Sequence, residues 1–275
     1  MYTNQKQIFY VNSNNRLSGT HSNFTYSFNM DRTQNYDRVV LLAASIPKSY
    51  YLIISGSNTF TLTENTSSVT ITITPGNYTR SSFASTLQSL LNSNSPNHYT
   101  YSITSNNMST TYDQGIFYFS VSGNSGIQPI FTFTTYLYEQ LGFNEKTSYQ
   151  FSSNSLQSIN VTNLTQETTL FLHSNMSINE GGDNVLQEIY ATGEQTFSYI
   201  NFINPIPYEY SKILTNDKSN SFTFTLTDEN GNEINTNGIN VNFTIMLYKS
   251  NDILNMIKMF LKYITLNNNQ NNILM

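Results

Sequence analysis

The stretch NSFTFTLTDENGNEINTNGINVNFTIMLYKS, residues 220–250, decides the fold class of this chain. Apolar and polar side chains alternate in two of its segments, 222–227 and 239–247. Such alternation places one row of side chains on a core and the other toward water. The intervening residues 228–238 are rich in Asp, Asn and Gly, which favour turns. The stretch therefore predicts an antiparallel strand pair that closes an all-β barrel or sandwich, and one sheet face of the pair should bury Phe222, Phe224, Leu226, Phe243, Ile245 and Leu247.

The composition favours a packed β domain with an aromatic core. The chain has 275 residues, 20 of them Tyr and 18 Phe, which suffices for one large β domain or two smaller ones. Charged residues make up only 11% and the net charge is -5, so no basic surface is available for a phosphate backbone. We expect no direct binding of nucleic acid. The absence of Cys removes disulfides and thiolate chemistry, so the fold must hold by packing.

The polar residues are mainly Asn, Ser, Thr and Gln, and this choice has two explanations. One is the codon composition of an AT-rich genome. The other is that neutral amide and hydroxyl surfaces suit contacts between subunits, whose buried centres are depleted of charge. Both explanations can hold together.

The first part of the chain predicts strands at 8–11 and 23–29, then an apolar stretch at 36–54. Its continuous run 39–44 is typical of a strand buried on both faces. Pro47 breaks the run before a strand resumes at 50–54. Charged residues and this proline interrupt the stretch, so it predicts no membrane span. The N-terminus lacks a secretory signal pattern, which argues against secretion.

The next part, residues 57–145, has the pattern of a small inserted α+β subdomain. It predicts strands at 59–63, 69–74, 99–103, 116–121 and 130–134, and helices at 81–91 and 137–141. Phe83, Leu87, Leu90 and Leu91 fall on one face of the longer helix. We expect this helix to pack on the sheet of its own subdomain.

Strands resume after the insertion, and a helical pattern closes the chain. The later strands are predicted at 156–161, 169–173, 186–191 and 196–202, followed by the pair in 220–250. Beyond Ser250 one helical face carries Ile253, Leu254, Ile257, Phe260, Leu261 and Ile264. The predicted organisation is a first part of the main domain at 1–56, the insertion at 57–145, the second part at 146–250, and an amphipathic helix with an Asn-rich tail at 251–275.

The sequence contains little that predicts chemistry. His21, His98 and His173 lie in unrelated contexts, and each is predicted not to bind a metal. Asp228, Glu229 and Glu233 could offer oxygens to a hard cation such as calcium, although a turn explains them better. No phosphate loop, nucleophile elbow or kinase motif is present. We therefore predict no catalytic residue, no cofactor, no metal site and no enzymatic activity.

Six segments carry a resemblance to a known family. They are YVNSNNRLSGTHSNFTYSFN (10–29), YDRVVLLAASIPKSYYLI (36–53), ITPGNYTRSSFASTLQSLL (73–91), LGF (141–143), INPIPYEYSKIL (203–214) and FTFTLTDENGNEINTNGINVNFTIMLY (222–248). In this order the chain resembles the minor capsid, or penton, protein of virophages and polinton-like DNA viruses. The turn LTDENGNEI before the last strand is the most specific part of the resemblance.

The resemblance implies a single jelly-roll sandwich that forms a homopentamer at the vertices of an icosahedral capsid. It implies a structural protein of the virion, assembled inside the host cell beside the major capsid protein. The insertion would face outward, where it could contact a host cell or giant-virus surface. About eight predicted strands outside 57–145 are enough for one jelly roll and too few for two.

Two other classes of protein compete with the capsid interpretation. A jelly-roll carbohydrate-binding or fibre-like attachment protein could stack sugar rings on exposed tyrosines, for example in the loop Ser49, Tyr50 and Tyr51. A glycoside hydrolase would need a pair of carboxylates on facing strands, and no such pair can be identified. The first alternative stays open from the sequence, and oligomer formation against saturable sugar binding distinguishes it from a capsid subunit.

Overall fold

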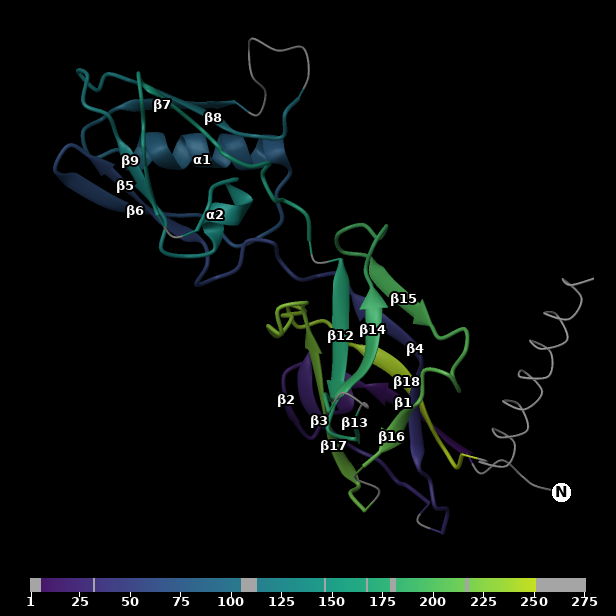
Figure 1. Cartoon of the computed structure of the whole chain (residues 1–275). Helices are drawn as coiled ribbons and strands as arrows, with labels where there is room; N and C mark the ends of the chain where they lie inside the picture. Colours follow the sequence, from purple (N-terminus) through teal and green to yellow (C-terminus); the bar gives the residue numbers. More distant parts are fainter. Residues whose placement is uncertain are drawn as a thin grey trace, which may run out of the picture. The chain divides into compact units, whose positions relative to one another are not determined.

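The computed structural model describes residues 6–31, 33–104, 113–145, 147–166, 168–178, 182–215 and 218–250 (Figure 1). Two compact units share these residues: unit 1 comprises Met1–Tyr50 and Glu167–Met275, and unit 2 comprises Tyr51–Gln166. Unit 2 extends past both ends of the expected insertion 57–145. The predicted C-terminal helix and tail, 251–275, lie outside the described residues.

Unit 1 consists of two antiparallel sheets. The six-stranded sheet has the order β1 (Lys6–Asn12), β18 (Asn242–Tyr248), β4 (Arg38–Pro47), β16 (Lys212–Leu214) and β13 (Ser177–Ile178), and β15 (Tyr199–Ile203) also pairs with β4. The five-stranded sheet has the order β14 (Val185–Tyr190), β12 (Thr169–Ser174), β17 (Ser221–Thr227), β3 (Asn23–Ser27) and β2 (Ser18–Gly19). A short 3-10 helix, Ser13–Asn15, follows β1.

The strand order of unit 1 is that of a jelly roll. In chain order its main strands are β1, β3, β4, β12, β14, β15 with β16, β17 and β18. The first, eighth, third and sixth lie side by side in one sheet, and the second, seventh, fourth and fifth in the other. This exchange of consecutive strands between two sheets defines a jelly roll. The predicted all-β fold is therefore confirmed, and the insertion lies between β4 and β12.

One detail of the prediction is wrong: β17 and β18 do not pair with each other. β17 pairs with β12 and β3, whereas β18 pairs with β1 and β4. The connection 228–241 crosses from one sheet to the other. It is longer than the two to five residues of a hairpin loop, so it can span the distance between the sheets. The six predicted core residues are all buried, but they come from the facing sides of two sheets.

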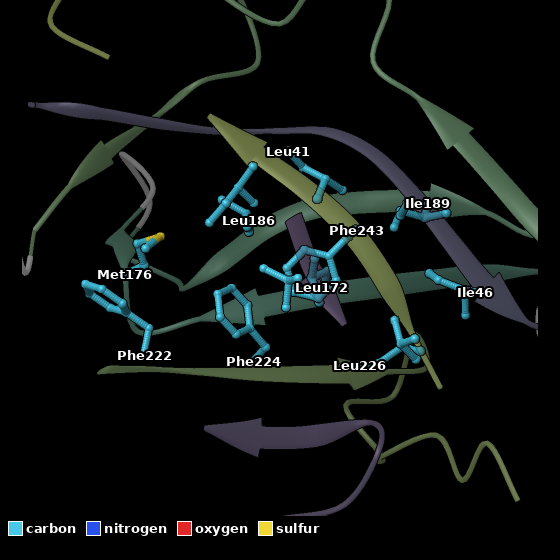
Figure 2. Close-up of a cluster of buried hydrophobic side chains, with 14 of the residues drawn as sticks. Leu41, Ile46, Leu172, Met176, Leu186, Ile189, Phe222, Phe224, Leu226 and Phe243 are labelled. Carbon is cyan, nitrogen blue, oxygen red and sulfur yellow. The ribbon is translucent and has the colours of Figure 1, made fainter. Parts of the chain in front are cut away.

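The core of unit 1 is aromatic, as the composition predicts. Phe222, Phe224 and Leu226 point from β17 toward Phe243 on β18 (Figure 2). The rings of Phe224 and Phe243 are 4.9 Å apart between centroids. Aromatic pairs at this separation add about 0.5–1.5 kcal/mol beyond the area that they bury.

β4 is apolar on both faces, in agreement with its sequence. Val39 and Leu41 lie in the main core, while Val40 packs with Met246 and Tyr248 in a second cluster on the opposite face. The strand that was predicted to resume at 50–54 is not formed. Residues 50–54 carry only an isolated bridge between Ile53 and Gly76.

Unit 2 is a small α+β unit with its own core. One sheet has the order β10 (Ser148–Gln150), β9 (Ile130–Thr132), β5 (Thr59–Glu64) and β6 (Ser67–Thr72), and the other has β11 (Ser155–Gln157), β8 (Tyr118–Ser122) and β7 (Thr100–Thr104). The helices are α1 (Arg80–Asn94) and α2 (Leu137–Gln140). β11 corresponds to the strand predicted at 156–161 for the second part of the main domain, and it lies in unit 2 instead.

Local sequence explains where the helices of unit 2 begin and end. Thr79 and Ser82 form a reciprocal capping box at the start of α1. After α2 the chain turns at Gly142, whose φ is +74°. A Cβ at this position would lie 2.4 Å from the carbonyl oxygen of Asn160, so only glycine fits.

Candidate functional site

The histidines have separate local partners. Nδ1 of His21 lies 3.2 Å from Oγ of Ser13, and burial together with nearby Arg16 lowers the pKa of His21. The ring nitrogens of His173 lie 3.0 Å from the side-chain oxygens of Asn184 and Thr227. His98 occupies a turn with a φ of +59°. Within the ranges that the structure describes, no three His, Asp or Glu side chains converge as metal ligands would.

The carboxylates of the turn after β17 accept hydrogen bonds from protein groups. Oδ1 of Asp228 accepts from the backbone amides of Asn230 and Asn232, at 2.9 and 2.8 Å. The carboxylate of Glu233 accepts from three side chains at the start of β3, those of Thr20, Ser22 and Asn23. These contacts are those of a turn held by its own carboxylates. They also tie the connection 228–241 to the five-stranded sheet.

Unit 2 contains a fully buried carboxylate, that of Glu64. Its Oε1 accepts from the hydroxyls of Ser95 and Tyr101, both at 2.7 Å, and its Oε2 accepts from the amide of Asn97, also at 2.7 Å. Burial and this hydrogen bond to Glu64 raise the pKa of Tyr101. Both oxygens of Glu64 are engaged within unit 2, so the group ties the end of β5 to the segment between α1 and β7.

A buried lysine anchors the loop that joins β14 to β15. The side chain of Lys48 is only 8% exposed, and its Nζ donates to the carbonyl oxygens of Ala191 and Glu194, at 3.0 and 2.9 Å. Burial lowers the pKa of Lys48, and the charge of Glu194 opposes this shift. The backbone of Lys48 also exchanges hydrogen bonds of 2.9 Å with Phe197 and Ser198. We call residues 191–198 the Phe197 loop.

The Phe197 loop displays an aromatic ring to solvent. Phe197 is 68% exposed and has a φ of +66°, which is rare for a bulky residue and persists only where the surroundings impose it. Here the backbone amide of Phe197 donates to the carbonyl oxygen of Lys48. Tyr190 and Tyr199, at the strand ends beside this loop, are exposed as well. Exposed aromatic side chains are enriched among the residues that contribute most to protein interfaces, so this loop is suited to contact a partner protein.

The sequence did not single out Phe197, although one signal was present. In the strand pattern 196–202, Phe197 shares the odd-numbered row with Tyr199, opposite to the buried Ile200. The pattern matches the exposure of its ring, although β15 begins only at Tyr199 and Phe197 itself lies in the loop. The contact with Lys48 had no such signal, because the two residues are far apart in the chain.

The tyrosine loop considered for sugar binding is mostly buried. Ser49 and Tyr50 are buried, with Tyr50 in the core of unit 1, and Tyr51 is 37% exposed. The expectation of an exposed tyrosine pair is therefore wrong.

Known proteins similar to this chain are found among solved structures. No protein-family model matches the chain, and no curated protein matches its sequence. Among solved structures, the chain is similar to the crystal structure of the SeMet-labeled mavirus penton protein. The identity is 10%, 90% of this chain and 100% of that chain are covered, and the TM-score is 0.43.

The strand order itself gives the fold class of this protein. Unit 1 is a single jelly roll, and a separate α+β unit is inserted between its strands β4 and β12. Among the described helices, none is both long and apolar enough to cross a membrane.

Proposed function

We propose that this chain is a structural virion protein, a minor capsid subunit that forms the pentameric capsomers, or pentons, at the vertices of an icosahedral capsid. The observation that carries the proposal is the strand order of unit 1, a complete single jelly roll interrupted by one insertion. The resemblance of six sequence segments to penton proteins supports a closed ring of five copies.

The subunit contacts of such a ring would be neutral and aromatic. A cyclic oligomer requires two different surfaces on each subunit, one meeting the other on the next copy. The chain has 12 Lys and Arg against 17 Asp and Glu, and the described residues form two ion pairs, Arg80 with Asp113 and Lys249 with Asp37. We assign the Phe197 loop to one of the two surfaces, because it is hydrogen-bonded to Lys48 and presents an exposed aromatic ring.

Sedimentation velocity of the purified chain tests the oligomer. We expect a species of five times 31.3 kDa that persists as salt rises, since screening weakens ion pairs and leaves apolar contacts intact. Phe197→Ser should weaken association without lowering the melting temperature. The matched control is Leu17→Ser, at another highly exposed apolar side chain. A stable monomer that binds sugar saturably would instead support a carbohydrate-binding protein.

In the virion, the proposed neighbours are the major capsid protein around each vertex and, through unit 2, a host cell or giant-virus surface. We place the assembly step inside the host cell. Mass spectrometry of purified particles tests this placement, because a vertex subunit must be present in a small fixed ratio to the major capsid protein. Absence of the chain from purified particles would contradict the proposal.

A further inference from the structure

We propose that the apolar side of residues 253–264 docks on the outer face of the six-stranded sheet of its own chain, in a groove between Tyr10 and Ile203. The proposal concerns how unit 1 is completed, and it does not depend on the capsid function. It joins two features left without a role: an apolar outer sheet face, and the amphipathic segment that follows β18.

Strand register defines the groove. Tyr10 lies opposite Thr244, Thr244 opposite Ala43, and Ala43 opposite Ile203, so these four residues form one outward row across β1, β18, β4 and β15. The two outer members, Tyr10 and Ile203, are each 78% exposed, and the two middle members are small. Tall walls and a low floor flank a groove of about 570 Å³, and the neighbouring polar row Asn12, Asn242, Ser45 and Asn201 lines it as well.

The outer face stays apolar beyond the groove. Toward the other end of the same strands lie Val40, Met246 and Tyr248, which the fold already buries, and Ile8 on β1, which is exposed beside them. A solvent-facing side of an antiparallel sheet is normally polar. The loop before β16 contacts this face at Tyr248, where the ring of Tyr208 packs edge-on at 5.2 Å. Tyr10 and Ile203 remain exposed, and an apolar partner is needed to cover them.

The chain leaves β18 from a fixed point at the far end of this face. The carboxylate of Asp37 accepts hydrogen bonds from Nζ of Lys249 at 2.8 Å and from the amide and hydroxyl of Ser250, both at 2.7 Å. Thr244 in the groove lies four residues back along β18, about 13 Å from Tyr248. As a helix, the twelve residues 253–264 would span about 18 Å. The segment is therefore long enough to return along β18 and reach the groove.

The sequence of the segment fits this placement. Asn251 and Asp252 suit the start of a helix, where side-chain oxygens cap free amides and negative charge is favourable. The six apolar residues of 253–264 share one helical face, and Lys258 and Lys262 would then point to water. Because the tether is only a few residues long, its own sheet face is available at millimolar effective concentration. The sheet face of a second copy, present at micromolar concentration, therefore competes poorly for the segment.

A single tryptophan reports docking, since the chain has none. In full-length Phe260→Trp we expect blue-shifted emission and shielding from acrylamide. In the control Lys262→Trp, on the opposite helical face, emission should be that of a water-exposed indole. Adding Ala43→Arg to Phe260→Trp should shift its emission to that of the control. Ile203→Asp is the second groove variant if Ala43→Arg does not fold. Equal exposure of the two reporters, or no response to the groove variants, would overturn the proposal.

Disulfide trapping tests whether the contact is made within one chain. The chain also lacks Cys, so a pair such as Ala43→Cys with Phe260→Cys introduces the only two thiols of each chain. We expect it to close within single chains, at a rate independent of protein concentration. The control pair Ala43→Cys with Lys262→Cys should close at least about tenfold more slowly, because its thiol faces away from the tethered surface. Bonds mainly between two chains, or equal rates for both pairs, would refute docking within the chain.

Discussion

At the residue scale, Glu64 shows how a single buried carboxyl group organises unit 2. Three donors converge on its two oxygens, and the single amide oxygen of a glutamine could accept from at most two of them. Glu64→Gln places an NH₂ group against at least one of them. We expect the free energy of unfolding of unit 2 to fall by about 1–3 kcal/mol, the cost of an unsatisfied buried donor.

Hydrogen exchange of the amides in β5 and β7 measures this loss in the full chain. Glu145→Gln, at an exposed carboxylate of the same unit, is the matched control and should leave protection unchanged. Unchanged protection in Glu64→Gln would show that the carboxylate is not needed for stability.

Asp37 gives a prediction of pH dependence. Burial opposes its charge, but hydrogen bonds from Lys249 and Ser250 outweigh burial, so the pKa of Asp37 is lowered from 3.8. A lowered folded-state pKa contributes stability that is complete above the unfolded value and is lost as pH falls through the folded one. Asp37→Asn should therefore destabilise the chain at neutral pH, and the difference from the wild type should shrink below pH 3.8. Urea titrations at several pH values measure it, and a difference constant with pH would contradict the assignment.

At the scale of elements, β18 holds the two sheets of unit 1 together through Phe243. Its ring lies within 4.9 Å of the Phe224 ring and 6.2 Å of the Phe24 ring, both on the opposite sheet. Phe243→Ala should cost about 3–5 kcal/mol, since the cavity borders two sheets that cannot both relax inward. Denaturant titration measures the cost. The matched control Thr223→Ala, at an exposed position of β17, should change the free energy of unfolding by less than about 0.5 kcal/mol.

At the scale of the whole molecule, the two units should fold independently. Each has its own hydrophobic core, and unit 2 is a continuous segment of chain. Replacing residues 51–166 by a short Gly/Ser linker should leave a jelly roll that melts cooperatively, because few contacts cross a true domain boundary. Differential scanning calorimetry of this deletion variant and of the isolated segment 51–166 measures whether each unit melts cooperatively by itself. An insoluble deletion without cooperative melting would mean that unit 2 completes the core of unit 1.

The sequence by itself determined the local structure of this protein. Alternation in 222–227 and 239–247 identified β17 and β18 and their buried residues, and the double-sided apolar run 39–44 identified β4. The turn residues at 228–233 were also assigned correctly. These features depend on the period of side chains along one strand and on the local preferences of Asp, Asn and Gly, which neighbours in the chain decide.

Only the tertiary structure decided which strands are neighbours and which side chains meet across the chain. Alternation marks an inward row but does not say which sheet the row belongs to, so β17 and β18 were expected in one sheet and lie in two. In the same way, Lys48 anchors the Phe197 loop, and Tyr10, Thr244, Ala43 and Ile203 line one groove. These contacts join residues far apart in sequence, and they exist because a jelly roll passes consecutive strands between facing sheets, which no local pattern encodes.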